Sequence, residues 1–132
     1  MSCCGSPNTN AAQGSAGNPF VVRQGSTFEF TLRFFRNGSP RDLSDRTGSA
    51  HLRASPGRGG NPLAEFDVSI RDPQTGSGRG RVDVRLGATV TAYPQIAAGD
   101  YVFDVELTLD ADPDDVIATD TFYLRLLPEV TL

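Results

Sequence analysis

The sequence predicts an all-β protein: an antiparallel sandwich of two sheets, with about seven strands and an extended N-terminal arm. Three observations predict it. Apolar and polar residues alternate with a period of two in several stretches, which is typical of strands with one buried and one exposed face. Turn-forming Gly, Pro, Asn and Asp residues separate these stretches. The pattern contains no convincing amphipathic helix, so the strands must cover one another.

The clearest strand is predicted at 27–36, with the sequence TFEFTLRFFR. Phe28, Phe30, Leu32 and Phe34 lie on one side of it and alternate with mostly polar residues. Each of these large apolar side chains contributes roughly 1.5–3 kcal/mol when it is fully buried. The remainder of the chain must therefore supply a second apolar face that covers this row.

The neighbouring segments supply strands and turns around this row. A short strand is predicted at 19–23, before the row, and Asn37-Gly38 after it is the strongest hairpin signal in the chain. Both residue types tolerate the positive φ that a two-residue hairpin turn requires. A further strand is predicted at 49–55, where the inward residues are small enough to face large ones.

The second half of the chain repeats the alternation. The further predicted strands are 63–70, 79–86, 101–109 and 116–127, and the loops between predicted strands are 56–62, 72–78 and 110–115. Alternation is lost at 88–96, where one helical turn before Pro94 is predicted. The strand count and the frequent turns favour an immunoglobulin-like sandwich, although the disulfide and core tryptophan of antibody domains are absent.

Length and composition predict one domain with a tail. Residues 19–132 would form the sandwich, and residues 1–18, rich in Gly, Ser, Asn and Ala, would form a flexible arm. The net charge of -4 argues against nucleic acid as a partner. No apolar run approaches the roughly 20 residues that span a bilayer, so no membrane partner is predicted. The N-terminus shows no secretory signal, which favours synthesis in a cytoplasm.

Cys3 and Cys4 are the only cysteines and lie in the predicted arm. Two thiols on an exposed arm are well placed to form an intermolecular disulfide once the protein meets an oxidising medium. Inert thiols, a metal site and lipidation are the alternatives, although a metal site needs about four ligands.

No catalytic residue, metal site or cofactor is predicted. His51, the only histidine, is expected on the outward face of its strand. The aspartates at 110–115 have the spacing of a calcium loop but lack its glycine and its distal glutamate, so a solvated hairpin tip is expected. The glycine-rich stretches 57–60 and 76–81 are expected to be turns, because neither continues as a phosphate-binding loop.

A series of short motifs resembles a known family of modules. The motifs are RQGSTF at 23–28, NGSP at 37–40, DLS at 42–44, VSIRD at 68–72, GDYVFDVEL at 99–107 and PEVT at 128–131. Their order resembles the small immunoglobulin-like β-sandwich modules of tailed bacteriophages, which include the virion-attaching domain of upper-baseplate and tail-fibre proteins. The resemblance spans about residues 19 to 131, and the block at 99–107 is its most specific part.

The resemblance implies a non-enzymatic structural protein of the phage virion, assembled in the host cytoplasm. It would be a baseplate or tail-fibre component, or an adaptor, attached through its N-terminal arm. Its partners would be other virion proteins, including copies of itself. A head decoration (cement) protein is the first alternative. A carbohydrate-binding sandwich is the second, and it would need exposed aromatic residues from a chain that has no Trp and only Tyr93, Tyr101 and Tyr123.

Overall fold

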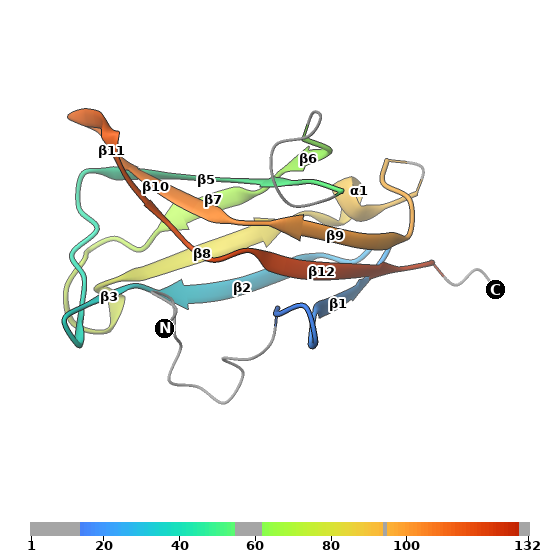
Figure 1. Ribbon diagram of the computed structural model, residues 1–132, viewed down its shortest axis with the longest axis horizontal. Coiled ribbons are helices and arrows are strands. Elements are labelled where there is room, and N and C mark those ends of the chain that lie inside the picture. The colour runs from blue at the N-terminus through green and yellow to red at the C-terminus, as the bar shows by residue number, and fades with distance from the viewer. Residues whose placement is uncertain (1–13, 55–61, 94, 130–132) are drawn as a thin grey trace.

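The computed structural model describes residues 14–54, 62–93 and 95–129. These residues form two facing β layers whose strands run mostly along the long axis of the molecule (Figure 1). The smaller layer contains, in spatial order, β2 (Phe28–Arg33), β8 (Arg81–Leu86) and β7 (Asp67–Ile70). All pairings in this layer are antiparallel.

The larger layer combines two hydrogen-bonded groups of strands. One group is β1 (Phe20–Arg23), β12 (Phe122–Leu127) and β9 (Gly99–Phe103), and the other is β11 (Asp112–Ala118), β10 (Val105–Leu109), β5 (Arg46–Leu52) and β6 (Ala64–Glu65). The groups join where β9 continues into β10 and where Arg53 and Val102 exchange two backbone hydrogen bonds of 2.8 Å.

The remaining elements connect the layers. They are the hairpin of β3 (Phe35–Arg36) and β4 (Ser39–Pro40), a 3₁₀ turn (Gly76–Gly78) and the short helix α1 (Ala88–Thr91). The hairpin confirms the predicted turn, because Asn37 and Gly38 have φ values of 54° and 82°. The helical turn predicted before Pro94 is confirmed by α1. No helix in the described part of the chain is long and apolar enough to cross a membrane.

The strand order confirms the predicted immunoglobulin-like sandwich. The smaller layer places β8 between β2 and β7, and the larger one places the β9–β10 strand between β5 and the β11–β12 strand. This is how immunoglobulin-like domains distribute their strands between two layers. Because the only cysteines lie at positions 3 and 4 and the sequence has no Trp, the relation to antibody domains is one of architecture.

One pairing differs from the antiparallel prediction. The first strand, β1, runs parallel to the last strand, β12, with Phe20 opposite Leu124 and Arg23 opposite Leu127. After Arg23 the chain turns at Gln24–Ser26 and crosses to β2 in the other layer. No hairpin therefore joins β1 to β12, and nothing forces the two strands to run in opposite directions.

Four long predicted strands each divide into two. The stretch 63–70 becomes β6 and β7, 101–109 becomes β9 and β10, 116–127 becomes β11 and β12, and 27–36 becomes β2 and β3. In the first case the two halves pair with different layers, β6 with β5 and β7 with β8. The period of two continues through the break because the apolar side chains keep facing the same core. Sequence periodicity therefore did not reveal the break.

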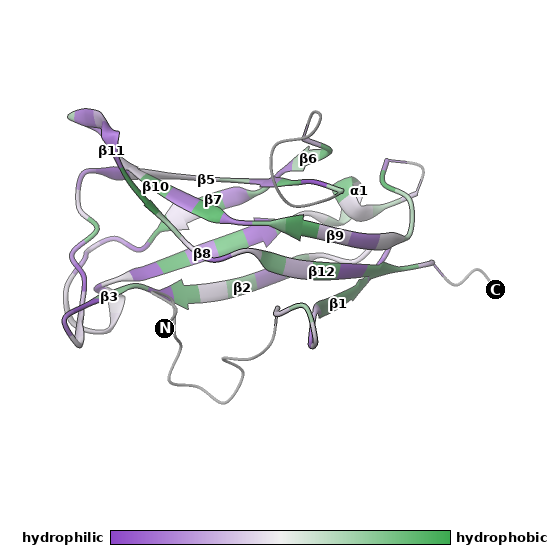
Figure 2. Cartoon of the chain, viewed as in Figure 1, coloured by the Kyte–Doolittle hydropathy of each residue, from purple (hydrophilic) through white to green (hydrophobic). Residues whose placement is uncertain are grey.

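The core between the layers is built around aromatic rings. Figure 2 shows hydrophobic and hydrophilic residues alternating along β8 and β12. Phe66 and Phe103 have ring centroids 4.5 Å apart. Phe28 and Phe34 are buried as predicted, whereas Phe30 is only partly buried and packs against Phe20 at 4.8 Å. Within the described residues, no buried side-chain nitrogen or oxygen lacks a hydrogen-bond partner.

The packed part of the chain begins before the predicted domain boundary. Residues 14–18 form a tight turn, closed by the hydrogen bond from the Gly14 N–H to the Asn18 carbonyl at 2.6 Å. The Gly14 carbonyl accepts a hydrogen bond from the Tyr123 N–H on β12, also at 2.6 Å. The chain therefore enters the sandwich at the β1–β12 edge from Gly14 onward, rather than from Pro19.

Candidate functional site

Polar and charged side chains gather around a hollow at the end of the sandwich where the β3–β4 hairpin lies. Three segments meet there: the hairpin itself, residues 41–46 before and at the start of β5, and the loop 71–80 between β7 and β8 (Figure 1). The first two segments are contiguous, whereas the loop 71–80 is distant from them in the sequence. Backbone hydrogen bonds connect these segments, and one buried side chain bonds to the backbone of both the loop and segment 41–46.

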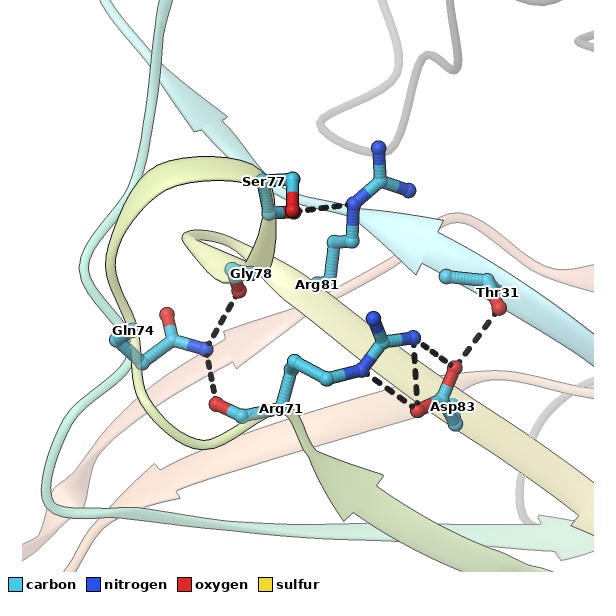
Figure 3. Close-up of polar contacts among 7 residues, drawn as sticks. All are labelled: Thr31, Arg71, Gln74, Ser77, Gly78, Arg81 and Asp83. Atoms are coloured by element: carbon cyan, nitrogen blue, oxygen red, sulfur yellow. Dashed lines mark hydrogen bonds and ion pairs between the residues drawn. The ribbon is translucent and has the colours of Figure 1, made fainter.

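That side chain is Gln74, whose amide makes four hydrogen bonds. Its Nε2 donates to the carbonyls of Arg71 at 2.6 Å and Gly78 at 3.0 Å, which closes the loop on itself (Figure 3). Its Oε1 accepts from the backbone N–H groups of Leu43 and Gly80, both at 2.9 Å. A buried amide with all these bonds satisfied fixes the loop relative to segment 41–46.

Gly80 holds the base of the hairpin against this loop. Its carbonyl accepts from the Phe34 N–H at 2.7 Å, and the Phe34 carbonyl accepts from the Arg41 N–H at 2.9 Å. A Cβ at position 80 would lie 2.6 Å from the Phe34 carbonyl oxygen, and φ is +80°. Only glycine allows this approach without strain. The backbone of Arg41 is therefore fixed at the rim of the hollow.

Four arginines line the hollow, which has a volume of about 420 Å³: Arg36 on β3, Arg41 after β4, Arg46 at the start of β5, and Arg79 from the loop. Asp42 also lines it. Guanidinium groups are the side chains that proteins use most for bidentate contact with carboxylates and phosphates.

Two of these arginines already have partners. Arg46 has a buried side chain, and its Nη2 lies 3.0 Å from Asp115 Oδ1 on β11. Its Nη1 also donates to the carbonyls of Leu107 and Asp115. Arg79 donates from Nε to the Pro40 carbonyl at 3.1 Å, and its Nη1 lies 3.9 Å from an Asp42 oxygen. Arg46 is therefore structural, and Arg79 is held in place by its Nε.

Arg36 and Arg41 have no hydrogen bond or ion pair from their guanidinium groups within the described residues. The pKa of Arg41 is lowered from its ordinary value, first by burial and then by the positive charges of Arg46 and Arg36, while Asp115 acts in the opposite direction. Arg41 is thus a cation placed among other cations. Such an arrangement favours the arrival of an anion.

Asp42 is held in its charged form beside this cluster. One of its oxygens accepts from the Ser44 N–H at 2.9 Å and from the Ser44 hydroxyl at 2.6 Å. These hydrogen bonds, with a smaller effect of the Arg79 charge, lower the pKa of the Asp42 carboxyl. The Asp42 carboxylate lines the hollow, and its hydrogen bonds from Ser44 fix its position.

A second charged cluster lies nearby on the outer face of the smaller layer (Figure 3). Arg71 Nη2 donates to Asp83 Oδ1 at 2.9 Å, and Arg71 Nε donates to Oδ2 at 3.2 Å. The Thr31 hydroxyl adds a third donor at 2.8 Å. The Arg71 hydrogen bond is the main cause that lowers the pKa of Asp83. These contacts connect β2, β7 and β8. Both oxygens of the Asp83 carboxylate accept hydrogen bonds in them.

The residues singled out by the sequence do not form a site in the described part of the chain. Cys3 and Cys4 lie outside the described residues, as does the stretch 57–60. His51 lies on β5 with a 39% exposed side chain, and its Nε2 is 4.0 Å from Glu65 Oε2.

The acidic segment 110–115 is exposed at a hairpin tip, as predicted, but the loop is shorter than predicted. The turn consists of Asp110 and Ala111 alone, and β11 begins at Asp112, which lies opposite Leu109. Asp110 accepts the Thr47 hydroxyl at 2.6 Å, and Asp115 pairs with Arg46. The described residues hold no group of three or more potential metal-ligating side chains.

The arginine hollow was missed by the sequence interpretation. Arg36, Arg41 and Arg46 follow one another at five-residue spacing around the Asn-Gly turn, and this spacing was the available signal. Nothing in the sequence indicated that Arg79 would join them, because its approach depends on the Gln74 hydrogen bonds.

Comparisons with known proteins give likenesses of fold only. No protein-family model and no curated protein matches the chain. Among solved structures, CopC from Methylosinus trichosporium OB3b shares 17% identity, with a TM-score of 0.43 over 86% of this chain and 88% of that one. The SrpA adhesin from Streptococcus sanguinis shares 15%, with a TM-score of 0.48 over 84% of this chain and 55% of that one.

The Ig1 domain of mouse SynCAM 2 shares 13% identity, with a TM-score of 0.37 over 85% of this chain and 93% of that one. Each of these proteins is similar to the chain at a low level of identity. The strand order of the described residues identifies the sandwich.

Proposed function

We propose that this chain is a structural protein of a tailed-phage virion, a baseplate or tail-fibre component or adaptor that attaches through its leading residues. The observation that carries the proposal is the order of motifs between residues 19 and 131. The most specific of them, GDYVFDVEL at 99–107, forms β9 and β10, the strand at the centre of the larger layer. The most specific motif therefore lies in the framework of the fold.

The packing of the sandwich supports a mechanical role. Aromatic rings from both layers pack against one another, as in the contacts of Phe28 with Phe66 and of Phe30 with Phe103. The connecting segments at both ends are tied by buried glutamines, Gln24 and Gln74. A densely packed module of this kind transmits force and holds its neighbours at a fixed distance.

The entry point of the chain supports attachment through the leading residues. Gly14 lies against β12 at one edge of the larger layer, where its carbonyl pairs with the Tyr123 N–H. A partner that binds residues before Gly14 would thus be placed beside the β1–β12 edge. Cys3 or Cys4 could make that attachment covalent by an intermolecular disulfide, which forms in an oxidising medium.

The three tyrosines do not favour the carbohydrate-binding alternative. Tyr93 is 70% exposed, but Tyr101 is buried and its hydroxyl donates to the Ala97 carbonyl at 2.5 Å. Tyr123 is half-buried on β12. These side chains do not form the row of exposed aromatics on one face that the alternative requires.

The proposal is tested by locating the chain. Purified tailed particles from the source culture would be analysed by mass spectrometry and labelled with an antibody against the chain for electron microscopy. We expect the chain in the particles, with label at the baseplate or fibres. Label over the head would replace the tail role by the head-decoration alternative. A chain found only outside particles would overturn the virion role.

The attachment is tested with a deletion of residues 2–13, which leaves the packed turn at 14–18 intact. We expect the deleted chain to fold but to be absent from particles, and normal incorporation would contradict the attachment. The matched variant Cys3→Ser/Cys4→Ser tests the covalent bond. Wild-type particles should give a reductant-sensitive band of higher mass on a denaturing gel, and the variant should lack it. Identical bands for both would refute the disulfide.

A further inference from the structure

We propose that the hollow lined by Arg36, Arg41 and Arg79 is a binding site for an oxyanion that carries about two negative charges. The site stands whether or not the chain is a virion protein, because it depends only on side chains of the described sandwich.

The local charge is opposite to that of the whole chain. Four arginines line the hollow, Asp42 is the one carboxylate among its lining residues, and Asp115 pairs with Arg46. Four positive charges against two negative ones leave an excess of two positive charges. The chain as a whole has a net charge of -4. The hollow is therefore a focused positive region on an acidic protein, which attracts anions.

The excess belongs to Arg36 and Arg41, whose guanidinium groups make no hydrogen bond or ion pair with the described residues. Partial burial, and then the repulsion of Arg46 and Arg36, lowers the pKa of Arg41, while the Asp115 carboxylate acts in the opposite direction. An anion between these groups would remove the repulsion and supply the missing hydrogen-bond acceptors.

The frame of the hollow is already in place before any ligand binds. The backbone of Arg41 is fixed by Phe34 and Gly80, and Gly80 and Leu43 are fixed by Gln74. Arg79, which also lines the hollow, is held by the hydrogen bond from its Nε to the Pro40 carbonyl. A preorganised site loses less conformational entropy on binding.

The arginine fork defines the class of ligand. A guanidinium presents parallel N–H groups that match two oxygens of one phosphate or one carboxylate. Two unpaired forks thus fit either a phosphate group or a pair of neighbouring carboxylates. A volume of about 420 Å³ accommodates both. The shared chemistry is a planar or tetrahedral set of oxygens with two negative charges.

The experiment is isothermal titration calorimetry of the full chain at neutral pH and low salt. Inorganic phosphate and pyrophosphate are the probes of one arm, and malonate is the probe of the other. Low salt is needed because exposed charges are screened over about 10 Å at 0.1 M ionic strength. We expect one saturable site. Binding of the phosphates alone assigns the site to a phosphate group, binding of malonate alone assigns it to carboxylates, and binding of both assigns it to the shared oxyanion chemistry.

Two variants with the same loss of charge separate the site from general electrostatics. Arg41→Gln removes an unpaired fork, and Arg125→Gln removes an exposed arginine that pairs with Asp100 at 2.8 Å in the larger layer. We expect Arg41→Gln to weaken the affinity by about tenfold or more, and Arg125→Gln by less than about twofold. Circular dichroism in anion-free buffer checks that both variants fold.

A third variant tests the fork itself. Arg41→Lys keeps the charge but loses the parallel N–H pair, so we expect an affinity between those of the wild type and Arg41→Gln. The proposal is overturned if neither arm shows saturable binding. It is also overturned if Arg41→Gln and Arg125→Gln weaken binding equally, because net charge alone would then account for the effect.

Discussion

Each end of the sandwich contains a buried glutamine, and the two glutamines are used differently. At the hairpin end, Gln74 makes four side-chain hydrogen bonds and joins the loop 71–80 to segment 41–46. At the other end, Gln24 makes two: its Nε2 donates to the Ile96 carbonyl at 2.6 Å, and its Oε1 accepts from the Glu129 N–H at 3.1 Å. Both side chains supply the hydrogen bonds that water would otherwise supply to backbone groups near the core.

The surroundings of the two ends differ more than the glutamines do. The Gln24 end is completed by Thr91, a fully buried residue whose hydroxyl accepts from the Gly25 N–H and donates to the Ser26 carbonyl. The Gln74 end is surrounded by arginines that line an open hollow. The Gln24 end also borders a hollow, of about 450 Å³, but the residues that line it, such as Val90, Gln95 and Ile96, include no arginine. The two ends therefore differ in the charge of their hollows, and the proposed oxyanion site is the arginine-lined one.

The largest expected effect compares two glycines with nearly the same φ. Gly80 at +80° and Gly25 at +83° would both suffer the left-handed strain of alanine, about 1–2 kcal/mol. A Cβ at Gly80 would also lie 2.6 Å from a backbone oxygen, whereas at Gly25 the nearest atom is a Glu129 side-chain oxygen at 3.4 Å. We expect Gly80→Ala to lower the free energy of unfolding by about 3 kcal/mol or more, and Gly25→Ala by about 1–2 kcal/mol.

Denaturant unfolding of both variants measures the difference. Equal losses at the two positions would show that the hairpin base yields to the new methyl group. In that case the frame of the hollow would be softer than its hydrogen bonds suggest.

The second comparison removes the glutamines themselves. Gln74→Ala leaves two N–H groups and two carbonyls without their partner, and Gln24→Ala leaves one of each. Each unsatisfied buried group costs about 1–3 kcal/mol, reduced when water enters. We expect losses of about 2–3 kcal/mol for Gln74→Ala and about 1–2 kcal/mol for Gln24→Ala. A larger loss for Gln24→Ala, measured by chemical denaturation, would reverse the comparison of the two ends.

The third prediction concerns acid. The folded pKa values of Asp42 and Asp83 are lowered from 3.8, mainly by hydrogen bonds from Ser44 and Arg71 respectively. A lowered carboxyl pKa stabilises the folded state above the unfolded pKa, and this contribution is lost as the pH falls through the folded pKa. We therefore expect stability to decline below about pH 4, as measured by unfolding midpoints across an acid series. Asp83→Asn should flatten that decline, and an unchanged slope in this variant would contradict the assignment.

The smallest expected effect compares two exposed ion pairs. Asp83 accepts from Arg71 and Thr31, whereas Asp100 accepts from Arg125 alone among the described residues. Exposed pairs contribute about 0–1 kcal/mol each because both groups remain solvated. We expect both Asp83→Asn and Asp100→Asn to fall within this range, with the larger loss for Asp83→Asn. Thermal unfolding at low and high salt would measure the difference in stability between the two variants, and high salt should reduce this difference.

Much of the fold was predictable because strand periodicity is a local property. The row Phe28, Phe30, Leu32 and Phe34 indicated a strand and the need for a covering layer, and the Asn37-Gly38 turn was located by residue type alone. The division of long strands was not predictable in this way. Phe66 fits the alternation on both sides of the break, although β6 and β7 belong to different layers.

The candidate site was less accessible to sequence interpretation than the fold. The spacing of Arg36, Arg41 and Arg46 could have drawn attention to one end of the sandwich. Their convergence with Arg79 depends on hydrogen bonds between segments about 30 residues apart, such as the one from the Leu43 N–H to Gln74 Oε1. Cys3 and Cys4, the residues that the sequence did favour, lie outside the described residues, and their role stays a prediction.

The sequence by itself determined that this protein is built from strands, since the alternation of apolar and polar side chains is set by the two-residue repeat of the extended backbone. It also determined where the chain turns, because Gly, Pro and Asn restrict or widen the choice of φ locally. Only the tertiary structure decided which strands share a layer, that β1 runs parallel to β12, and that four arginines meet at one end. Those features depend on contacts between distant segments, which no local pattern records.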